Sequence, residues 1–333
     1  MRNKISGVIL CALFFALSFS VQAQQAKSVP KIGYLSRELH PSDSRASSNR
    51  QLDGFREGLR QLGYVEGKNI VIEYRYAEGR LERFPALAEE LVRLKVEILV
   101  AEITSVARAA RKVTSTIPIV FLAGGDPIES GSVASLARPG GNVTGLTSLT
   151  VELRGKRLEL LKEVVPKVSR FALLEEVGAN KIYISDAQAA AKALGVQLQL
   201  IEVKAPNPDL EGAFQVMVKE RVGGLVSGPG ILFTLTLHRR TTLELAEKNR
   251  MPSIYGSEVF IDDGGLMYYG ASITDLARRG ATYVDKILKG AKPADLPVER
   301  PVKFDLGINL KAAKQIGLTI PPNVLARADR VIK

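Results

Sequence analysis

Short apolar segments alternate with amphipathic segments along most of the chain. Residues 31–35 are mostly apolar and predict a strand, and residues 49–62 place Leu52, Phe55 and Leu59 on one face at helical spacing. The same alternation predicts strands at 69–76, 96–101 and 117–123 and helices at 83–94 and 106–114. Strands and helices that alternate with short links are typical of a parallel sheet covered by helices on both faces.

The alternation restarts after residue 150 and predicts a second unit of the same kind. Its expected helices are 153–165, 184–194, 211–220 and 235–249, and its expected strands are 170–174, 197–203, 224–227 and 252–255. A strand at 264–269, a helix at 274–289 and a strand at 302–310 follow. Residues 138–145, with one proline and three glycines, suit a bend between the units. We therefore predict an α/β protein of two doubly wound parallel-sheet lobes.

The first 23 residues differ from the rest of the chain. Arg2 and Lys4 precede an apolar run at 7–17, and residues 21–23 have a small-x-small pattern. These features predict a cleavable secretory signal peptide at 1–23, whose apolar core is too short to span a membrane. Processing would leave 310 residues with a net charge of +9 and would remove Cys11, the only cysteine. We expect a periplasmic protein without disulfides, and without membrane insertion once the signal is cleaved.

Signals for catalysis are sparse. The chain has two histidines, His40 and His238, far apart in sequence, and no Cys/His cluster with zinc-ligand spacing. Neither a P-loop nor a G-x-G-x-x-G fingerprint occurs, and Ser227 is one position away from a nucleophile-elbow pattern. The basic residues are scattered rather than clustered. We therefore predict no catalytic residue, no metal site, no cofactor and no nucleic-acid partner.

Polar and small residues follow the predicted strands, where the parallel-sheet architecture places ligands. We expect a small-molecule ligand to be bound in the first unit by Ser36, Glu102, Thr104, Ser105 and Asp126, and in the second by Glu175, Asn180, Tyr255 and Tyr269. For Thr104, Ser105 and Asp126 the alternative is a helix-capping role, because hydroxyls and carboxylates are preferred at helix N-termini. Together the two sets describe a cleft between two lobes.

Several long segments resemble one family. They include G-F-R-E-G-L-R-Q-L-G-Y-V-E-G-K-N at 54–69, L-A-R-P-G-G-N-V-T-G-L at 136–146, G-K-R-L-E-L-L-K at 155–162 and A-T-Y-V-D-K-I-L-K-G-A-K-P-A-D-L-P-V-E at 281–299. In these segments the chain resembles the periplasmic substrate-binding proteins of ABC transporters, in the branch related to tryptophan- and tyrosine-uptake proteins. The resemblance implies a type I binding-protein fold with three hinge crossings. It also implies a monomer that delivers a small solute to ABC permease membrane subunits.

This architecture and the restart of the pattern define the expected lobes. Residues 31–145 with 270–291 would form the N-terminal lobe, and residues 149–263 with 304–333 the C-terminal lobe. The crossings are expected near 142–148, 262–269 and 292–303. Glycine tolerates the backbone rotation that lobe closure requires, so the predicted hinge residues are Gly145, Gly264, Gly265 and Gly270.

The chain departs from the family pattern by placing carboxylates at two strand ends, Glu102 in one lobe and Glu175 with Glu176 in the other. Together with Asp126 they favour a solute with an ammonium group, because buried carboxylates need a cationic partner or a proton. Tyr255 and Tyr269 would supply an aromatic wall. We expect an amino-acid-like or amine-bearing solute. The alternatives are a periplasmic sensor domain that signals to a membrane receptor or kinase, and a chain that has lost its solute.

Overall fold

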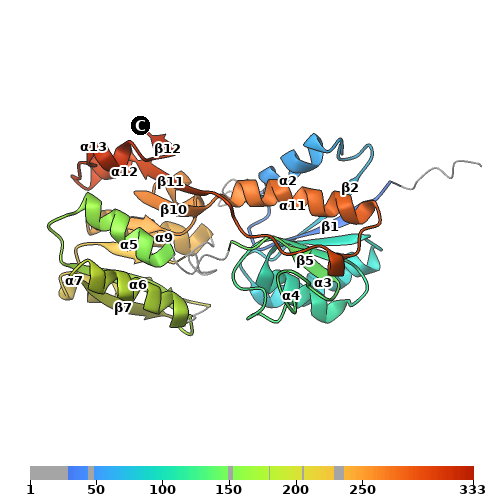
Figure 1. Cartoon of the computed structure of the whole chain (residues 1–333), viewed down its shortest axis with the longest axis horizontal. Helices are drawn as coiled ribbons and strands as arrows, with labels where there is room; N and C mark the ends of the chain where they lie inside the picture. Colours follow the sequence, from blue (N-terminus) through green and yellow to red (C-terminus); the bar gives the residue numbers. More distant parts are fainter. Residues whose placement is uncertain (1–28, 44–48, 149–152, 180, 205, 229–235) are drawn as a thin grey trace, which may run out of the picture.

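The structure, a computed structural model, describes residues 29–43, 49–148, 153–179, 181–204, 206–228 and 236–333. The predicted signal peptide at 1–23 and the predicted site residue Asn180 lie outside these ranges. Two sheets flanked by helices form two lobes that lie side by side (Figure 1). The prediction of two α/β lobes built on parallel sheets is confirmed.

The first sheet has five parallel strands in the order β2-β1-β3-β4-β5. Its strands are β1 Lys31–Ser36, β2 Val71–Tyr76, β3 Ile98–Ile103, β4 Ile119–Ala123 and β5 Val143–Gly145, and its helices are α2 Arg50–Gln61, η2 Leu81–Arg83, α3 Phe84–Arg93, α4 Thr104–Val113 and α11 Ile273–Leu288. Alternate residues of β1 enter opposite cores, Tyr34 with α2 and α11 and Leu35 with α3 and α4. The sheet is therefore buried on both faces, as a parallel sheet requires.

Helices α2 and α11 are far apart in sequence but lie side by side on the first lobe (Figure 1). A Cβ on Gly54 would overlap the backbone oxygen of Thr274, and one on Gly58 that of Arg278, so glycine allows the close approach. Leu276 and other apolar side chains of α11 join the core that contains Phe55. The late helix thus packs on the lobe formed by the beginning of the chain.

The second sheet has seven strands in the order β12-β11-β10-β9-β8-β6-β7. Its strands are β6 Arg170–Glu176, β7 Gln197–Val203, β8 Leu225–Ser227, β9 Ser253–Tyr255, β10 Met267–Ala271, β11 Phe304–Asn309 and β12 Arg330–Ile332, and its helices are α5 Leu153–Val164, α6 Lys181–Ala193, α7 Leu210–Lys219, α9 Thr236–Lys248, α10 Val259–Asp262, α12 Leu310–Gln315 and α13 Pro322–Leu325. Strands β6 to β10 repeat the strand order of the first lobe. The sheet is mixed, since β11 is antiparallel to β10, which the sequence pattern did not predict.

The chain passes between the lobes three times: between β5 and α5, between β10 and α11, and between the 3-10 helix η3 (Pro293–Asp295) and β11. The first and third connections are paired near their starts, where Thr147 N–H donates to Glu299 O at 2.9 Å. The second is short, with Ser272 capping α11 by accepting a hydrogen bond from Asp275 N–H. These connections are the candidates for a hinge.

The second connection lies later than predicted. Strand β10 pairs with both β9 and β11, so the chain stays in the second lobe through Ala271 instead of leaving it between 262 and 269. Gly264 and Gly265 therefore lie in a turn inside that lobe, and Gly270 lies in β10 opposite Asp305. These placements do not support a hinge role for Gly264 and Gly265, because no connection passes through them.

Gly145 ends β5 in a conformation that requires glycine. Its φ of +148° lies in the region that favours glycine, and a Cβ there would overlap the backbone oxygen of Phe121 in β4. Glycine at this position is thus explained by the pairing of β5 with β4. Its role as a hinge stays a prediction.

Candidate ligand cleft

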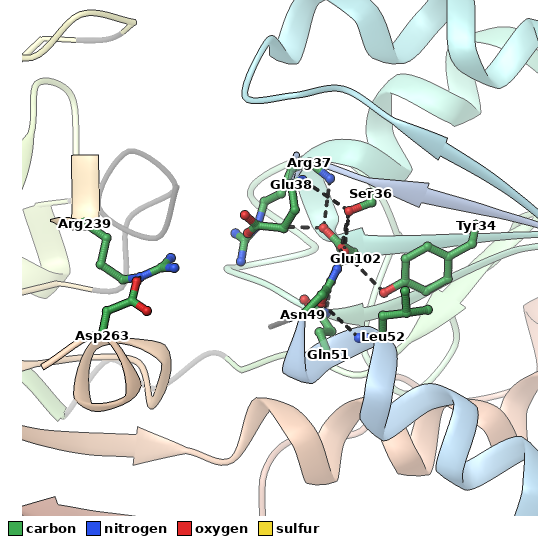
Figure 2. Close-up of polar contacts among 10 residues, drawn as sticks. All are labelled: Tyr34, Ser36, Arg37, Glu38, Asn49, Gln51, Leu52, Glu102, Arg239 and Asp263. Atoms are coloured by element: carbon green, nitrogen blue, oxygen red, sulfur yellow. Dashed lines mark hydrogen bonds and ion pairs between the residues drawn. The ribbon is translucent and has the colours of Figure 1, made fainter. Parts of the chain in front are cut away.

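Glu102 lies at the end of β3 and organises the loop that follows β1 (Figure 2). It is 1% exposed, and its carboxylate accepts hydrogen bonds from Ser36 Oγ at 2.8 Å, Arg37 N–H at 2.9 Å, Asn49 Nδ2 at 2.8 Å and Tyr34 Oη at 3.3 Å. These donors come from two segments of the first lobe. The carboxylate is therefore occupied within its own lobe, and the expectation that it contacts a ligand ammonium group is not supported.

Burial controls the titration of this cluster. Desolvation raises the pKa of the Glu102 carboxyl, and the nearby Arg37 guanidinium, 3.8 Å away, opposes that rise. Burial and the adjacent carboxylate raise the pKa of Tyr34 well above its usual value. Ser36, predicted to contact the ligand, is fully buried and donates to Glu102. The loop after β1 is thus positioned by a buried network, and the residues beyond Ser36 extend toward the second lobe.

The other predicted residues of the first lobe lie at the ends of β3 and β4. Thr104 is the buried first residue of α4, and Ser105 follows it half-buried. Asp126 Oδ1 accepts hydrogen bonds from Ile128 N–H at 2.8 Å and Glu129 N–H at 3.1 Å. Asp126 therefore holds a turn and not a helix start, so the helix-capping alternative does not describe it, and its side chain is half-buried.

Glu175 at the end of β6 is paired inside the second lobe. It is 2% exposed and forms a two-bond ion pair with Arg154 of α5, in which Nε donates to Oε1 and Nη2 donates to Oε2 at 3.1 Å. A Cβ on Gly228, just after β8, would lie 2.6 Å from Glu175 Oε1. Since Arg154 already supplies the countercharge, Glu175 does not need a ligand ammonium group.

The two tyrosines predicted to form an aromatic wall have other environments. Tyr255 is fully buried in the core of the second lobe, where its ring stacks on Phe260 with centroids 4.2 Å apart. The prediction of a ligand contact for Tyr255 is therefore not supported. Tyr269 is half-buried in β10 against Phe304, and its backbone oxygen accepts a hydrogen bond from Arg157 Nε at 2.8 Å.

Tyr183, in the first turn of α6, marks where the two lobes approach each other. Its ring lies 4.4 Å from the Arg154 guanidinium. Burial raises the pKa of Tyr183 to about 12; Arg154 lowers it, and the negative charges of Asp126, Glu129 and Glu175 raise it further. Carboxylates of the first lobe are thus close enough to act on a side chain of the second. The sequence prediction missed Tyr183 because the expected helix began at 184.

A cavity of about 730 Å³ lies between the lobes. Its lining from the first lobe is Arg37, Glu38, Leu39, Asp43, Glu78, Gly79, Arg80 and Glu82, and from the second lobe Pro206, Asn207, Leu237, His238 and Arg240. These segments follow the carboxyl ends of β1, β2, β7 and β8. The cavity thus lies at the edge of each sheet to which the strand-end rule points, but the predicted site residues are not among its lining.

Figure 2 shows Arg239 and Asp263 of the second lobe across from Arg37 and Glu38 of the first. Arg239 Nε donates to Asp263 Oδ2 at 2.8 Å, and both side chains are largely buried. Arg37 Nε lies 3.3 Å from Glu38 Oε1. Each lobe therefore has one positive and one negative side chain at this place. Such an arrangement is suited to a ligand that carries both charges.

Two carboxylates at the short helix α10 reach the first lobe: Asp262 at its end and Glu258 just before its start. Asp262 accepts a hydrogen bond from Nη2 of Arg50, the first residue of α2, at 2.7 Å. Glu258 accepts hydrogen bonds from the backbone N–H of Thr274 at 2.9 Å and its hydroxyl at 2.7 Å. Because helix N-termini favour negative charge, α10 is held against the starting ends of α2 and α11.

The described residues contain no group of three or more histidine, cysteine or acidic side chains placed to hold a metal ion. His40 lies within 2.7 Å of Ser42, and burial lowers the pKa of His238, which lines the cavity. Among the same residues, no helix has both the length and the apolar content that a membrane crossing requires.

The comparisons with known proteins cover nearly the whole chain. Residues 43–332 match the family model described as ABC transporter substrate binding protein. A tyrosine-binding protein of Clostridioides difficile (strain R20291) is 26% identical over 302 residues, covering 88% of this chain and 82% of that protein.

Solved structures agree over similar lengths. A conserved domain protein from Vibrio cholerae matches with a TM-score of 0.79 and 29% identity, covering 91% of this chain and 99% of that one. An ABC domain from Streptococcus pneumonia, solved in complex with L-Trp, matches with a TM-score of 0.78 and 26% identity, covering 92% of this chain and 100% of that one. Both lobes and their connections are included in these matches.

Proposed function

Because the chain belongs to the family of ABC transporter substrate-binding proteins, we propose that it captures a small amino-acid-like zwitterion between its two lobes. Membership of this family confirms the resemblance seen in the sequence, and with it a solute-binding role in a type I binding-protein fold. The family consists of binding proteins rather than enzymes. The captured solute would be passed to the membrane permease subunits of an importer.

The observation that carries this proposal is the cavity of about 730 Å³ lined by both lobes. A ligand there would touch residues that follow β1, β2 and β7 and residues of α9, so it would bind more tightly when the lobes are closed. Ligand binding would therefore shift the population toward the closed form. The volume is within the range of cavities that hold small ligands.

The charges around the cleft support a zwitterion over a simple amine. Arginine and acidic side chains line the cavity together, including Arg37, Glu38, Glu78 and Arg80. The relatives support the same class, since one is a tyrosine-binding protein and another was solved with L-Trp. A zwitterion can contact a positive and a negative side chain of this lining at once, whereas a simple amine would contact only the acidic ones.

The proposal includes the setting in which the protein acts. With the signal peptide removed, the chain would work in the periplasm as a monomer. It would approach the membrane only by docking on the permease subunits, since delivery of the solute needs no insertion.

A thermal-shift screen of residues 24–333 with the common L-amino acids, polyamines, nucleosides and aromatic acids tests the proposal. An amino acid present at about 100 times its Kd adds roughly 2.7 kcal/mol to the free energy of unfolding, and so raises the Tm. The variant Arg37→Gln should weaken this shift, while Arg60→Gln on the exposed side of α2 should not. A Tm raised only by compounds without an amino group would contradict the proposal.

A further inference from the structure

Arg157 is a buried cation without a carboxylate partner. It lies in α5, is 1% exposed and heads the fully buried side chains by volume. Nε donates to the backbone oxygen of Tyr269 at 2.8 Å, while Nη1 has no hydrogen-bond partner among the described residues. Within those residues no carboxylate oxygen lies within 4.0 Å of its guanidinium, in contrast to Arg154 three residues earlier. A buried charge left in this state lowers the stability of the protein.

The guanidinium lies at the edge of the second sheet where its parallel strands end, beyond the residues that line the cavity of about 730 Å³. Tyr269 is near the end of β10, two residues before the chain crosses to α11. A Cβ on Gly270 would lie 3.8 Å from Arg157 Nη2 and 2.6 Å from the backbone oxygen of Gly256, which directly follows β9. Arg157 therefore lies at the carboxyl ends of two neighbouring parallel strands, where ligands bind in sheets of this type.

The neighbouring acidic groups are already engaged. Glu175 forms two hydrogen bonds with Arg154, and Asp186 accepts one from the backbone N–H of Gly155 at 2.7 Å. Burial and the charge of Arg154 lower the pKa of Arg157 to about 9, although Glu175 and Asp186 oppose this. Arg157 therefore remains protonated at neutral pH, and among the described residues Glu175 and Asp186 act on its charge without pairing directly with its guanidinium.

We infer that Arg157 is the specificity residue that binds the carboxylate of the captured solute, an inference that rests on the proposed function. A carboxylate at this edge would pair directly with the guanidinium and accept hydrogen bonds from its unused N–H groups. The solute's ammonium group then points toward the first lobe, where Asp126 lies at the end of β4. The second lobe therefore selects for the acid group, although the sequence placed Glu175 there as an ammonium contact.

The ligand-free protein provides the first test, by urea unfolding of Arg157→Gln, Arg157→Lys and the control Arg327→Gln. The control breaks an exposed ion pair with Glu163. Glutamine keeps a donor for Tyr269 O but removes the uncompensated charge, so Arg157→Gln should unfold at the same or a higher urea concentration than the wild type. An arginine with only a structural role would give a lower midpoint, and that result would overturn the inference.

Calorimetric titration with L-tyrosine, tyramine and 3-(4-hydroxyphenyl)propionate provides the second test. Tyramine lacks the carboxylate and the propionate lacks the ammonium group. Wild type should bind L-tyrosine best, and Arg157→Gln should lose at least about 30-fold in affinity for L-tyrosine and for the propionate. Its affinity for tyramine should be unchanged, while Arg157→Lys should retain part of the L-tyrosine affinity and Arg327→Gln all of it.

The outcomes separate the inference from the proposed function. If wild type and Arg157→Gln bind L-tyrosine equally well, the inference is wrong and the zwitterion proposal stands. If wild type binds none of the three compounds and no other amino acid raises its Tm, the proposed function fails and the inference fails with it.

Discussion

Glu102 and Glu175 both lie near the carboxyl ends of parallel strands but are stabilised in different ways. Glu102 is in β3, the central strand of the first sheet, Glu175 is in β6, beside the edge strand β7 of the second, and each is at least 98% buried. Glu102 accepts hydrogen bonds from several donors, mainly uncharged, of two segments. Glu175 is neutralised by one guanidinium. A carboxylate at a strand end thus has no fixed role, and its partners decide whether it shapes a loop or balances a charge.

The largest expected effect is from breaking the ion pair of the second lobe. Glu175→Ala would leave Arg154 buried without a countercharge and next to Arg157, at a cost of about 3–5 kcal/mol in the free energy of unfolding. Urea unfolding at pH 7 measures this cost. The double variant Arg154→Met/Glu175→Leu should recover most of it, because no buried charge is then unpaired. A loss below about 1 kcal/mol in the single variant would show that the pair is not buried as described.

Glu102→Ala should be less destabilising than Glu175→Ala. It would leave Ser36, Asn49 and the Arg37 N–H without their acceptor, costing about 1–3 kcal/mol. Ser36→Ala, which removes one donor and keeps the carboxylate, serves as the matched control and should cost about 1 kcal/mol. The same urea experiment applies, and a larger loss for Glu102→Ala than for Glu175→Ala would reverse the comparison.

The pH dependence of stability should reflect the burial of Glu102. Because burial raises the pKa of this carboxyl in the folded protein, the folded state binds its proton more readily than the unfolded state. The resulting stabilisation is complete below the unfolded value of 4.5 and is lost as the pH rises through the folded pKa. Wild type should therefore gain stability relative to Glu102→Gln as the pH falls from about 7 toward about 5. Urea unfolding of both proteins across this range measures the difference, and an opposite trend would contradict the assignment.

The smallest effect is expected at the carboxylate between the lobes. Asp262 pairs with Arg50 of the first lobe and with Arg330 of the second, at 2.7 Å each, and both arginines are about one-third exposed. Asp262→Asn should cost less than about 1 kcal/mol, and salt should reduce this cost by screening the exposed arginines. Unfolding at low and high sodium chloride concentration measures this, with Glu57→Gln on α2 as an intrahelical control. A cost that does not depend on salt would place Asp262 with the fully buried pairs.

Much of the secondary structure was predictable because its signals are local. The strand predicted at 197–203 is β7 residue for residue, and the helix predicted at 153–165 ends one residue earlier as α5. Apolar spacing depends only on which residues face the nearby core, so it can be read along the chain. The start of α6 was missed because its first turn, from Lys181, has little buried apolar surface.

The candidate site was predictable only as a location. The strand-end rule pointed to the edge of each sheet where the structure has a cavity lined by both lobes, and to the neighbourhood of Ser36, Glu102 and Glu175. Whether those carboxylates are available to a ligand was not predictable, because Asn49 is 53 residues from Glu102 and Arg154 is 21 residues from Glu175. The unpaired state of Arg157 had no sequence signal, since it consists of missing partners in space.

The sequence alone determined two α/β units, their order and the family, since these follow from periodicity and from long ordered motifs. Only the tertiary structure decided that β11 runs antiparallel to β10, that the chain passes between the lobes at Ser272, and which group pairs with each buried charge. The reason is physical: periodicity records whether a position is buried, whereas a buried charge is stabilised by whichever groups the fold brings within about 4 Å. Those groups come from other elements, and their distance along the chain has no relation to their distance in space.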